Sequence, residues 1–301
     1  MPRKRKGNPV HGWVVLDKPY GLGSTSAVGK VRWLYTAQKA GHAGTLDPLA
    51  TGILPIALGE ATKTVPFMME AKKGYQFTLT FGENTDTWDS EGEVTETSDI
   101  RPSEADILKA VPQFIGDIEQ IPPRYSAIKV AGKRSYDLAR SGEVVELKSR
   151  QVTIDSFKLL KFDGDAATFD VTCGKGTYIR PLARDLAAAL GTCGHVTMLR
   201  RTRVGPFHLE QSFTLDALEK LCHRGGVSGA LRPVETPLDD IPVAALTEQE
   251  AIELKHGRAI AVPPSFSAEN SEWILVMLEE TVIALCDAQD GFLRPKRVFN
   301  I

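Results

Sequence analysis

Two stretches of strict alternation constrain the fold of this chain most strongly. Residues 75–81 place Tyr75, Phe77, Leu79 and Phe81 on one side and Gln or Thr on the other, and residues 167–173 alternate in the same way. This period of two is typical of a half-buried β-strand. Further strands are expected at residues 12–16, 53–58, 152–162 and 195–208. The sequence therefore contains enough strand to build a sheet of substantial size.

Helical patterns lie between the strands without alternating with them one for one. Helices are expected at residues 24–35, 60–71, 103–114 and 182–190. Ser24, Thr25 and Ser26 offer oxygens that could cap the first helix, and Pro181 suits the first turn of the last one. Because strands and helices do not strictly interleave, we expect an α+β fold with a mixed, mostly antiparallel central sheet and flanking helices.

The chain divides into three predicted parts. Residues 1–10 form a basic tail, residues 11–232 a large domain, and residues 243–301 a small β-rich domain. Three prolines between Leu231 and Pro242 predict a linker between the two domains. In the small domain we expect a helix at residues 247–256 and strands at residues 273–278 and 282–286.

The formal net charge of −2 hides a strong gradient. Residues 234–301 carry −7 and residues 82–106 carry −8, so the rest of the first 233 residues is at +13. Residues 124–150 add a local +4 with two interleaved tyrosines, and residues 195–208 contain three arginines and no acid. Those arginines are expected to face solvent or a ligand. Concentrated positive charge of this kind indicates a polyanion partner, although a solvated surface has the same composition.

Several classes of protein are disfavoured by the sequence. No apolar run reaches the length of a membrane span, and the basic N-terminus is not followed by an apolar segment of the kind that secretion signals contain. The four cysteines lie far apart and form no C-x-x-C pair, so neither a disulfide framework nor a zinc site is indicated. We therefore expect a cytoplasmic protein with no membrane contact, no metal and no cofactor.

One loop combines tight turns with a single acid. Residues 41–52 contain three glycines and one proline, and Asp47 is the only acid between Asp17 and Glu60. Pro48 keeps the backbone of Asp47 out of the α region. An acid in this setting is either a turn former, because Asp-Pro is a common turn opener, or a catalytic carboxylate.

Motif searches narrow the chemistry open to Asp47. The phosphate-binding loop, the dinucleotide-binding glycine motif, the Gly-x-Ser-x-Gly elbow and the His-Glu-x-x-His motif are all absent from the sequence. Glycoside hydrolysis requires a second nearby acid, and the sequence does not point to one. What remains is a carboxylate that could act as a nucleophile in a protein whose charge suits a polyanion.

Motifs along residues 12–210 resemble those of the TruB family of tRNA pseudouridine synthases, in the family order. The stretch from Gly44 to Gly52 is similar to the nucleophile loop of that family over nearly its whole length. The other matching segments are Leu16-Asp17-Lys18-Pro19, Lys73-x-Tyr75, Thr85-Asp86-Thr87-x-Asp89, Pro122-Pro123-x-Tyr125-Ser126-Ala127, Gly176-Thr177-Tyr178-Ile179-Arg180 and Leu199-Arg200-Arg201-Thr202.

The resemblance implies a pseudouridine synthase fold with a small PUA-like C-terminal domain. It implies an isomerase that converts the T-loop uridine at tRNA position 55 to pseudouridine after the base has flipped out of the loop. Asp47 would be the nucleophile, and Arg180 would pair with it and keep its carboxylate ionised. No metal or cofactor is needed for this redox-neutral reaction.

The resemblance also assigns substrate-binding roles. Tyr75 would stack on the target base, with its hydroxyl where the C5 proton leaves, while Tyr178 and Leu199 would line the pocket. Thr45 would bind substrate in the nucleophile loop. His42 would fill the space left by flipped bases.

The expected partner is the T arm of tRNA, with Lys18 and residues 124–150 lying along its backbone. No obligatory protein partner is expected. Two alternatives remain: an RNA-binding or tRNA-folding module in which catalysis is secondary, and the related guide-RNA-directed enzyme of ribosomal RNA. The acidic residues 234–301 resemble the family domain only loosely, and their charge of −7 is unusual for an RNA contact.

Overall fold

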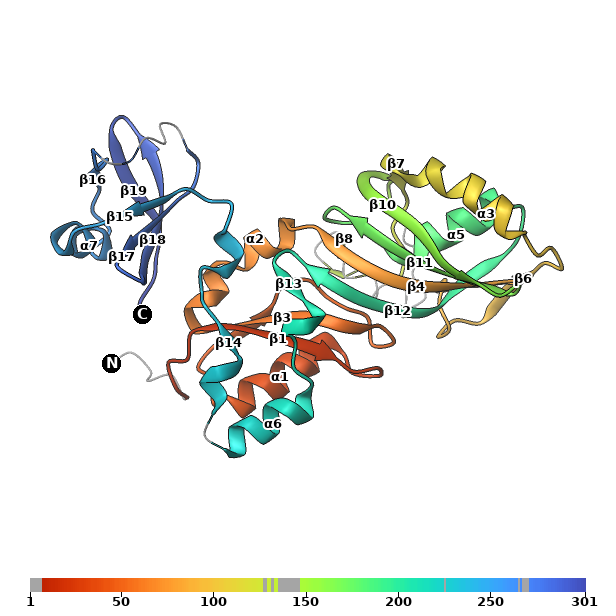
Figure 1. Ribbon diagram of the computed structural model, residues 1–301, viewed down its shortest axis with the longest axis horizontal. Coiled ribbons are helices and arrows are strands. Elements are labelled where there is room, and N and C mark those ends of the chain that lie inside the picture. The colour runs from red at the N-terminus through yellow and green to blue at the C-terminus, as the bar shows by residue number, and fades with distance from the viewer. Residues whose placement is uncertain are drawn as a thin grey trace.

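The computed structural model describes residues 7–126, 129–130, 133–134, 147–224, 226–264, 266 and 271–301. A long sheet runs through the molecule, and a smaller sheet formed by the C-terminal residues lies at one end (Figure 1). Among the described residues, no helix has both the length and the apolar character needed to cross a membrane.

The large sheet has the order β14-β1-β3-β12-β4-β11-β10-β7, with β2 paired to β3 and β13 paired to β12. All of its pairs are antiparallel except β12 with β3. The mixed, mostly antiparallel sheet predicted from the sequence is therefore confirmed. Its strands are β1 (Gly12–Lys18), β2 (Ala40–His42), β3 (Thr51–Leu58), β4 (Lys73–Phe81), β7 (Gly116–Gln120), β10 (Arg150–Phe162), β11 (Ala166–Cys173), β12 (Gly194–Val204), β13 (Phe207–His208) and β14 (Leu231–Arg232). Two short hairpins, β5 (Glu83–Thr85) with β6 (Val94–Thr97) and β8 (Lys129–Val130) with β9 (Lys133–Arg134), lie outside it.

Strand β4 lies between β12 and β11 and shows why alternation was informative. Phe77, Leu79 and Phe81 are buried in one cluster with residues of β10, β11 and helix α5 (Ile179–Ala189). Tyr75, the first residue of the alternating set, lies at the edge of that cluster. The same alternation therefore builds the core and delivers one aromatic side chain to its border.

The helices pack on the large sheet in two groups. Helix α1 (Ser24–Leu34) and helix α6 (Leu215–His223) cover β1 and β3 through a cluster that includes Val31, Leu54 and Leu218. Helix α3 (Glu104–Ala110) and α5 cover the other end of the sheet (Figure 1). Ser103 forms a capping box with Asp106 at the start of α3.

Two local predictions about helices are wrong. Ser24, Thr25 and Ser26 do not cap α1, which follows Gly23 without a side-chain cap; the Ser24 hydroxyl instead pairs with the backbone of Leu46. Residues 60–71 do not form one helix. A 3-10 turn, η1 (Gly59–Lys63), is followed by helix α2 (Val65–Glu70), because Pro66 has no N–H to donate and is tolerated in the first turn of a helix but not in its interior.

The C-terminal sheet has the order β15-β17-β18-β19-β16. Helix α7 (Glu248–Lys255) packs on it, with a capping box between Thr247 and Glu250 at its start. The sequence predicted α7, β17 and β18 but not the three other strands. The strands are β15 (Val243–Ala245), β16 (Ile260–Ala261), β17 (Ile274–Leu278), β18 (Thr281–Gln289) and β19 (Phe292–Val298).

The segment predicted as a linker is part of the packed structure. Strand β14 pairs with β1, the 3-10 turns η4 (Val227–Ala230) and η5 (Thr236–Leu238) flank it, and Val234 and Leu238 are buried. One cluster joins Trp13 and Ile53 of the large sheet to Leu285 of the small one. The prolines of this segment shape a tight connection rather than a loose one.

Gly52 marks the closest approach of two strands. Its φ is +99°, and a Cβ atom there would overlap the carbonyl group of Arg201 in β12. The parallel pairing of β3 with β12 opposes these two residues directly. Only a glycine allows the chain that leaves the Asp47 loop to enter the sheet at this point.

Candidate active site

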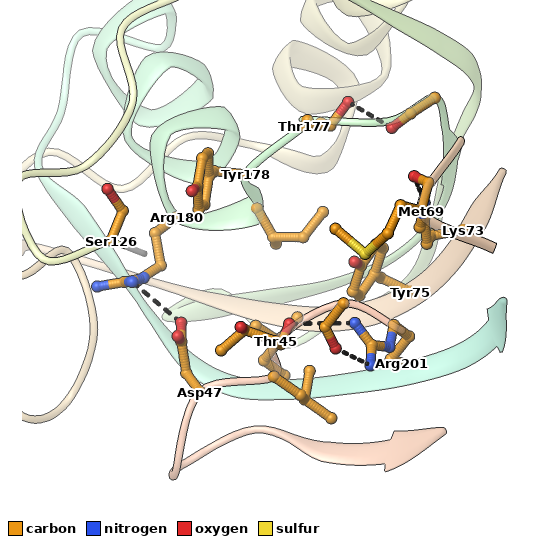
Figure 2. A pocket seen from close by; sticks show the side chains of 16 residues that line it. Thr45, Asp47, Met69, Lys73, Tyr75, Ser126, Thr177, Tyr178, Arg180 and Arg201 are labelled. Atoms are coloured by element: carbon orange, nitrogen blue, oxygen red, sulfur yellow. Dashed lines mark hydrogen bonds and ion pairs between the residues drawn. The ribbon is translucent and has the colours of Figure 1, made fainter. Parts of the chain in front are cut away.

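A cavity of about 310 Å³ opens beside the loop that carries Asp47 (Figure 2). Its walls come from segments far apart in the sequence, which the large sheet brings together. They are the loop Gly44–Asp47, Met69 of α2, Lys73 and Tyr75 of β4, Ser126, residues 174 and 176–178, Ile179 and Arg180 of α5, and Leu199 and Arg201 of β12.

The Asp47 loop is fixed by hydrogen bonds on both sides of the acid. The Ser24 hydroxyl pairs with the Leu46 backbone, donating to its carbonyl and accepting from its N–H. The backbone N–H of Gly21 and the ammonium of Lys18 both donate to the carbonyl of Pro48, at 2.9 and 3.1 Å. The residue types that predicted a tight loop therefore also place Asp47 in a defined position.

Arg180 binds two carboxylates at once. One of its terminal nitrogens lies 3.0 Å from Asp47 and the other 3.1 Å from Asp89. It also donates to the backbone carbonyls of Thr87 and Tyr125. The Arg180 side chain is only 6% exposed, whereas that of Asp47 is 41% exposed. The predicted pairing of Arg180 with Asp47 is present, and the acid still faces the open side of the cavity.

Asp89 is an acid of the site that was not predicted as a site residue. It lies in the strongly acidic segment 82–106, yet it is buried. The Thr87 hydroxyl and the Glu91 N–H donate to its carboxylate, and Trp88 beside it adopts a φ of +61°. The Arg184 guanidinium lies 4.1 Å from the Trp88 ring centroid. The position of Asp89 in a recognised motif was the only available signal.

Tyr75, Tyr178 and Leu199 all line the cavity, as predicted. Gln120 fixes Tyr178 by bonding both its N–H and its carbonyl, and Arg150 lies over the Tyr178 ring at 5.0 Å. Burial raises the pKa of Tyr75, while the nearby charge of Arg201 and its hydrogen bond act to lower it. The Tyr75 hydroxyl is therefore protonated near neutral pH.

Two buried cations form part of the cavity, and neither was predicted as a site residue. Arg201 is 2% exposed, which corrects the expectation that the arginines of residues 195–208 face solvent or a ligand. Lys73 is 8% exposed and donates to the carbonyls of Met69 and Ala71 at the end of α2. Burial, followed by the repulsion of Arg201, lowers the pKa of Lys73 to about 8.

Lys18 does not have the predicted position. Its side chain is fully buried and donates to the carbonyls of Pro19, Leu22 and Pro48. Burial lowers its pKa to about 8 despite the attraction of Asp47. Because the ammonium is enclosed by backbone, Lys18 stabilises the Asp47 loop instead of lying along an RNA backbone.

Two other predicted residues border the neighbouring space. Thr45 lines the cavity and also, with His42, a second cleft of about 720 Å³ on the other side of Asp47. Most of the basic segment 124–150 lies outside the described residues. Within the described part of the chain, no group of three or more His, Cys, Asp or Glu side chains could hold a metal ion.

Comparison with known proteins identifies the family. Residues 32–179 match the N-terminal domain of the TruB family pseudouridylate synthases, and residues 180–241 match the tRNA pseudouridylate synthase B C-terminal domain. The tRNA pseudouridine synthase B of Caulobacter vibrioides is 53% identical over 309 residues, covering 100% of both chains. The chain belongs to the TruB family of pseudouridine synthases. Members of the TruB family are isomerases, so the cavity beside Asp47 is the candidate active site of an isomerase.

Other relatives agree with membership of the TruB family. The tRNA pseudouridine synthase B of Bradyrhizobium diazoefficiens is 53% identical over 304 residues, covering 99% of this chain and 88% of the relative. A chain in the crystal structure of a Cbf5-Nop10-Gar1 complex matches with a TM-score of 0.74 and 26% identity, covering 96% of this chain and 85% of the other. The pseudouridine synthase fold predicted for this chain is confirmed by these matches.

Proposed function

We propose that this protein is a tRNA pseudouridine synthase that isomerises the T-loop uridine at position 55. The observation that supports this most strongly is the geometry of Asp47, whose carboxylate is oriented by Arg180 at 3.0 Å beside a cavity with an aromatic wall. A carboxylate held in one geometry beside a pocket is what attack by an acid nucleophile requires. Full-length relatives that are about half identical to this chain are named tRNA pseudouridine synthase B, which supports tRNA as the substrate.

The reaction breaks the C1′–N1 glycosidic bond of uridine and forms a C1′–C5 bond. N1 gains a proton, C5 loses one, and no atom is added or removed overall. Asp47 attacks as a carboxylate, either at the sugar to give an acylal or at the base to give a Michael adduct. The freed base rotates while the walls of the cavity hold it, and it rejoins through carbon.

The cavity is suited to one extruded base. Its volume of about 310 Å³ is at the lower end of ordinary ligand sites, and Tyr75, Tyr178 and Leu199 give it flat and apolar walls. A base within a folded RNA loop reaches such a pocket only by leaving its stack. We therefore propose that the target uridine is flipped out, that Tyr75 stacks on it and that Tyr178 and Leu199 enclose it. The hydroxyl of Tyr75 would lie where the C5 proton departs.

His42 and Thr45 extend this proposal beyond the target base. Both line the cleft on the other side of Asp47, next to the start of α1. We propose that His42 fills space vacated when the loop opens and that Thr45 contacts the nucleotide near the nucleophile.

The test follows tritium released from a tRNA transcript labelled at uridine C5. Release by the wild-type protein, without added metal or partner protein, and its loss in Asp47→Ala are the expected results. Asp117→Ala is the control, since Asp117 is an exposed acid of β7 that accepts a hydrogen bond from the Thr153 hydroxyl and lines neither cleft. No release from a bound tRNA would contradict the proposal and favour an RNA-folding module.

A second substrate distinguishes the guided alternative. An isolated T-arm hairpin, labelled in the same way, should also release tritium with this protein alone. Activity that required a guide RNA or further proteins would instead support the guided alternative.

A further inference from the structure

Arg201 occupies a central position beneath the cavity. In β12 it lies opposite Tyr75 of β4 on one side and opposite Gly52 of β3 on the other. The backbone of Arg201 is therefore fixed by both neighbouring strands, and its side chain, which is only 2% exposed, enters the floor of the cavity (Figure 2).

The guanidinium of Arg201 binds three backbone carbonyls with three different nitrogens. Nη2 donates to Gly44 at 3.1 Å, Nη1 to Thr45 at 3.2 Å and Nε to Ile53 at 2.7 Å. Gly44 and Thr45 precede Asp47 by three and two residues in the loop. Hydrogen bonds from a charged donor are stronger than those between neutral groups, so Arg201 can fix the backbone that presents the nucleophile.

The same side chain lies next to the aromatic wall. Arg201 and Tyr75 are direct partners in the pairing of β12 with β4, and both side chains line the cavity. One planar group thus binds the loop of Asp47 and lies beside Tyr75, although these lie on different elements. The fork-like geometry of arginine suits this task, whereas lysine has a single ammonium.

We propose that Arg201 is a positioning residue that sets the Asp47 loop relative to Tyr75, so that both address the same bound base. This inference rests on the proposed function, because it assigns a role within that reaction. Arg201 lines the floor of the cavity but is almost fully buried under the loop, so its role is to position the groups above it. Its loss is expected to affect the chemical step and not the association with tRNA.

The first test is Arg201→Lys, measured by tritium release under single-turnover and steady-state conditions. Lysine keeps the charge but cannot reach three divergent carbonyls. A small displacement of a reacting group can reduce a rate by about 10²-fold, so we expect kcat to fall by about that factor while KM for tRNA changes less than twofold. Arg203→Lys, two residues further along β12 and lining a different cavity, should stay within twofold of wild type.

Three outcomes would overturn the inference. The first is a kcat of Arg201→Lys within twofold of wild type. The second is an equal loss of kcat in Arg203→Lys. The third is a parallel change of kcat, KM and thermal stability in Arg201→Lys, which would indicate a merely structural role. Absence of tritium release by the wild-type protein would instead refute the proposed function, and this inference with it.

A second variant perturbs the same contact from the loop and does not depend on the folding of Arg201→Lys. Gly44 has a φ of +95°, and a Cβ atom there would lie 3.7 Å from Nη1 of Arg201, so Gly44→Ala strains the loop backbone without a clash. We expect kcat to fall at least tenfold with KM unchanged. Gly164→Ala is the control, because Gly164 has a φ of +94° and no atom within 4 Å of the added Cβ. Equal rates in these two variants would contradict the proposal.

Discussion

Charged side chains are buried around Asp47, whereas those of the C-terminal sheet lie at the surface. Around the site, Lys18, Arg180 and Arg201 are at most 5% exposed, and their charges are matched by carbonyls and carboxylates that face them from several elements. In the C-terminal region the ion pairs lie at the surface, as in Arg258 with Glu253, whose side chains are 59% and 31% exposed. Its core is an apolar cluster around Leu254, Ile283 and Leu293.

Buried and exposed charges differ in how strongly they restrain the structure around them. Surface pairs contribute about 0–1 kcal/mol and restrain little. Buried cations cost solvation but fix the backbone and carboxylates that they bind. Such rigidity is valuable where a nucleophile must be held in one geometry, and the acidic C-terminal sheet has no comparable arrangement among its described residues.

The largest expected effect concerns the second carboxylate on Arg180. Asp89→Asn preserves the shape of the side chain but removes the charge that holds Arg180 from the side opposite Asp47. Because preorganised electrostatic groups contribute about 10²–10³-fold to rates, we expect kcat for tritium release to fall by about 10²-fold. Binding of tRNA should be unchanged.

Asp117→Asn is the matched control for Asp89→Asn, since it changes an exposed acid that accepts a hydrogen bond from the Thr153 hydroxyl and lies outside both clefts. Its kcat should remain within twofold of wild type. A wild-type kcat in Asp89→Asn would show that this buried carboxylate contributes no more to the rate than an ordinary surface ion pair does.

An intermediate effect concerns the cost of a buried cation. Burial lowers the pKa of Lys73 in the folded protein to about 8, from 10.5 in an exposed chain. The unfolded state therefore binds more protons between about pH 8 and 10.5, and the free energy of unfolding should rise with pH in that window. Relative to Lys73→Met, the wild type should gain about 1–3 kcal/mol of stability between pH 7 and 10.

Denaturant unfolding at several pH values measures this gain. A difference between wild type and Lys73→Met that did not change with pH would show that Lys73 carries no such cost.

The smallest effect tests the C-terminal sheet. Thr247→Ala removes the capping box of α7, and the loss of a cap costs about 1 kcal/mol. Thermal unfolding should detect this loss, while kcat for tritium release remains that of wild type. Thr281→Ala, at an exposed position at the start of β18, should change neither quantity. A fall in kcat caused by Thr247→Ala would mean that the C-terminal sheet is coupled to the chemical step.

The parts of the fold that follow from local patterns could be predicted from the sequence. Alternation in residues 75–81 and 167–173 identified β4 and β11, which pair directly. Short edge strands such as β15 and β16 could not be found, because two or three residues carry no detectable period. The division into domains at residues 11–232 and 243–301 stays a prediction.

For the site, too, the sequence could predict local features but not the burial of side chains. The tight loop around Asp47 and its pairing with Arg180 followed from residue types and a family resemblance. The burial of Lys18 and Arg201 did not, because a charged residue is expected at the surface unless its partners are known. Those partners are backbone carbonyls brought together by the strand order, which no local pattern encodes.

Gly52 has a consequence for how this sequence can change over evolutionary time. Its α-hydrogen faces the carbonyl of Arg201, and any larger group would separate the two strands that carry the loop and the cation beneath it. A substitution at position 52 would therefore be tolerated only if β12 also moved. The loop can vary around Asp47 only within limits set by a residue that has no side chain and takes no part in the chemistry.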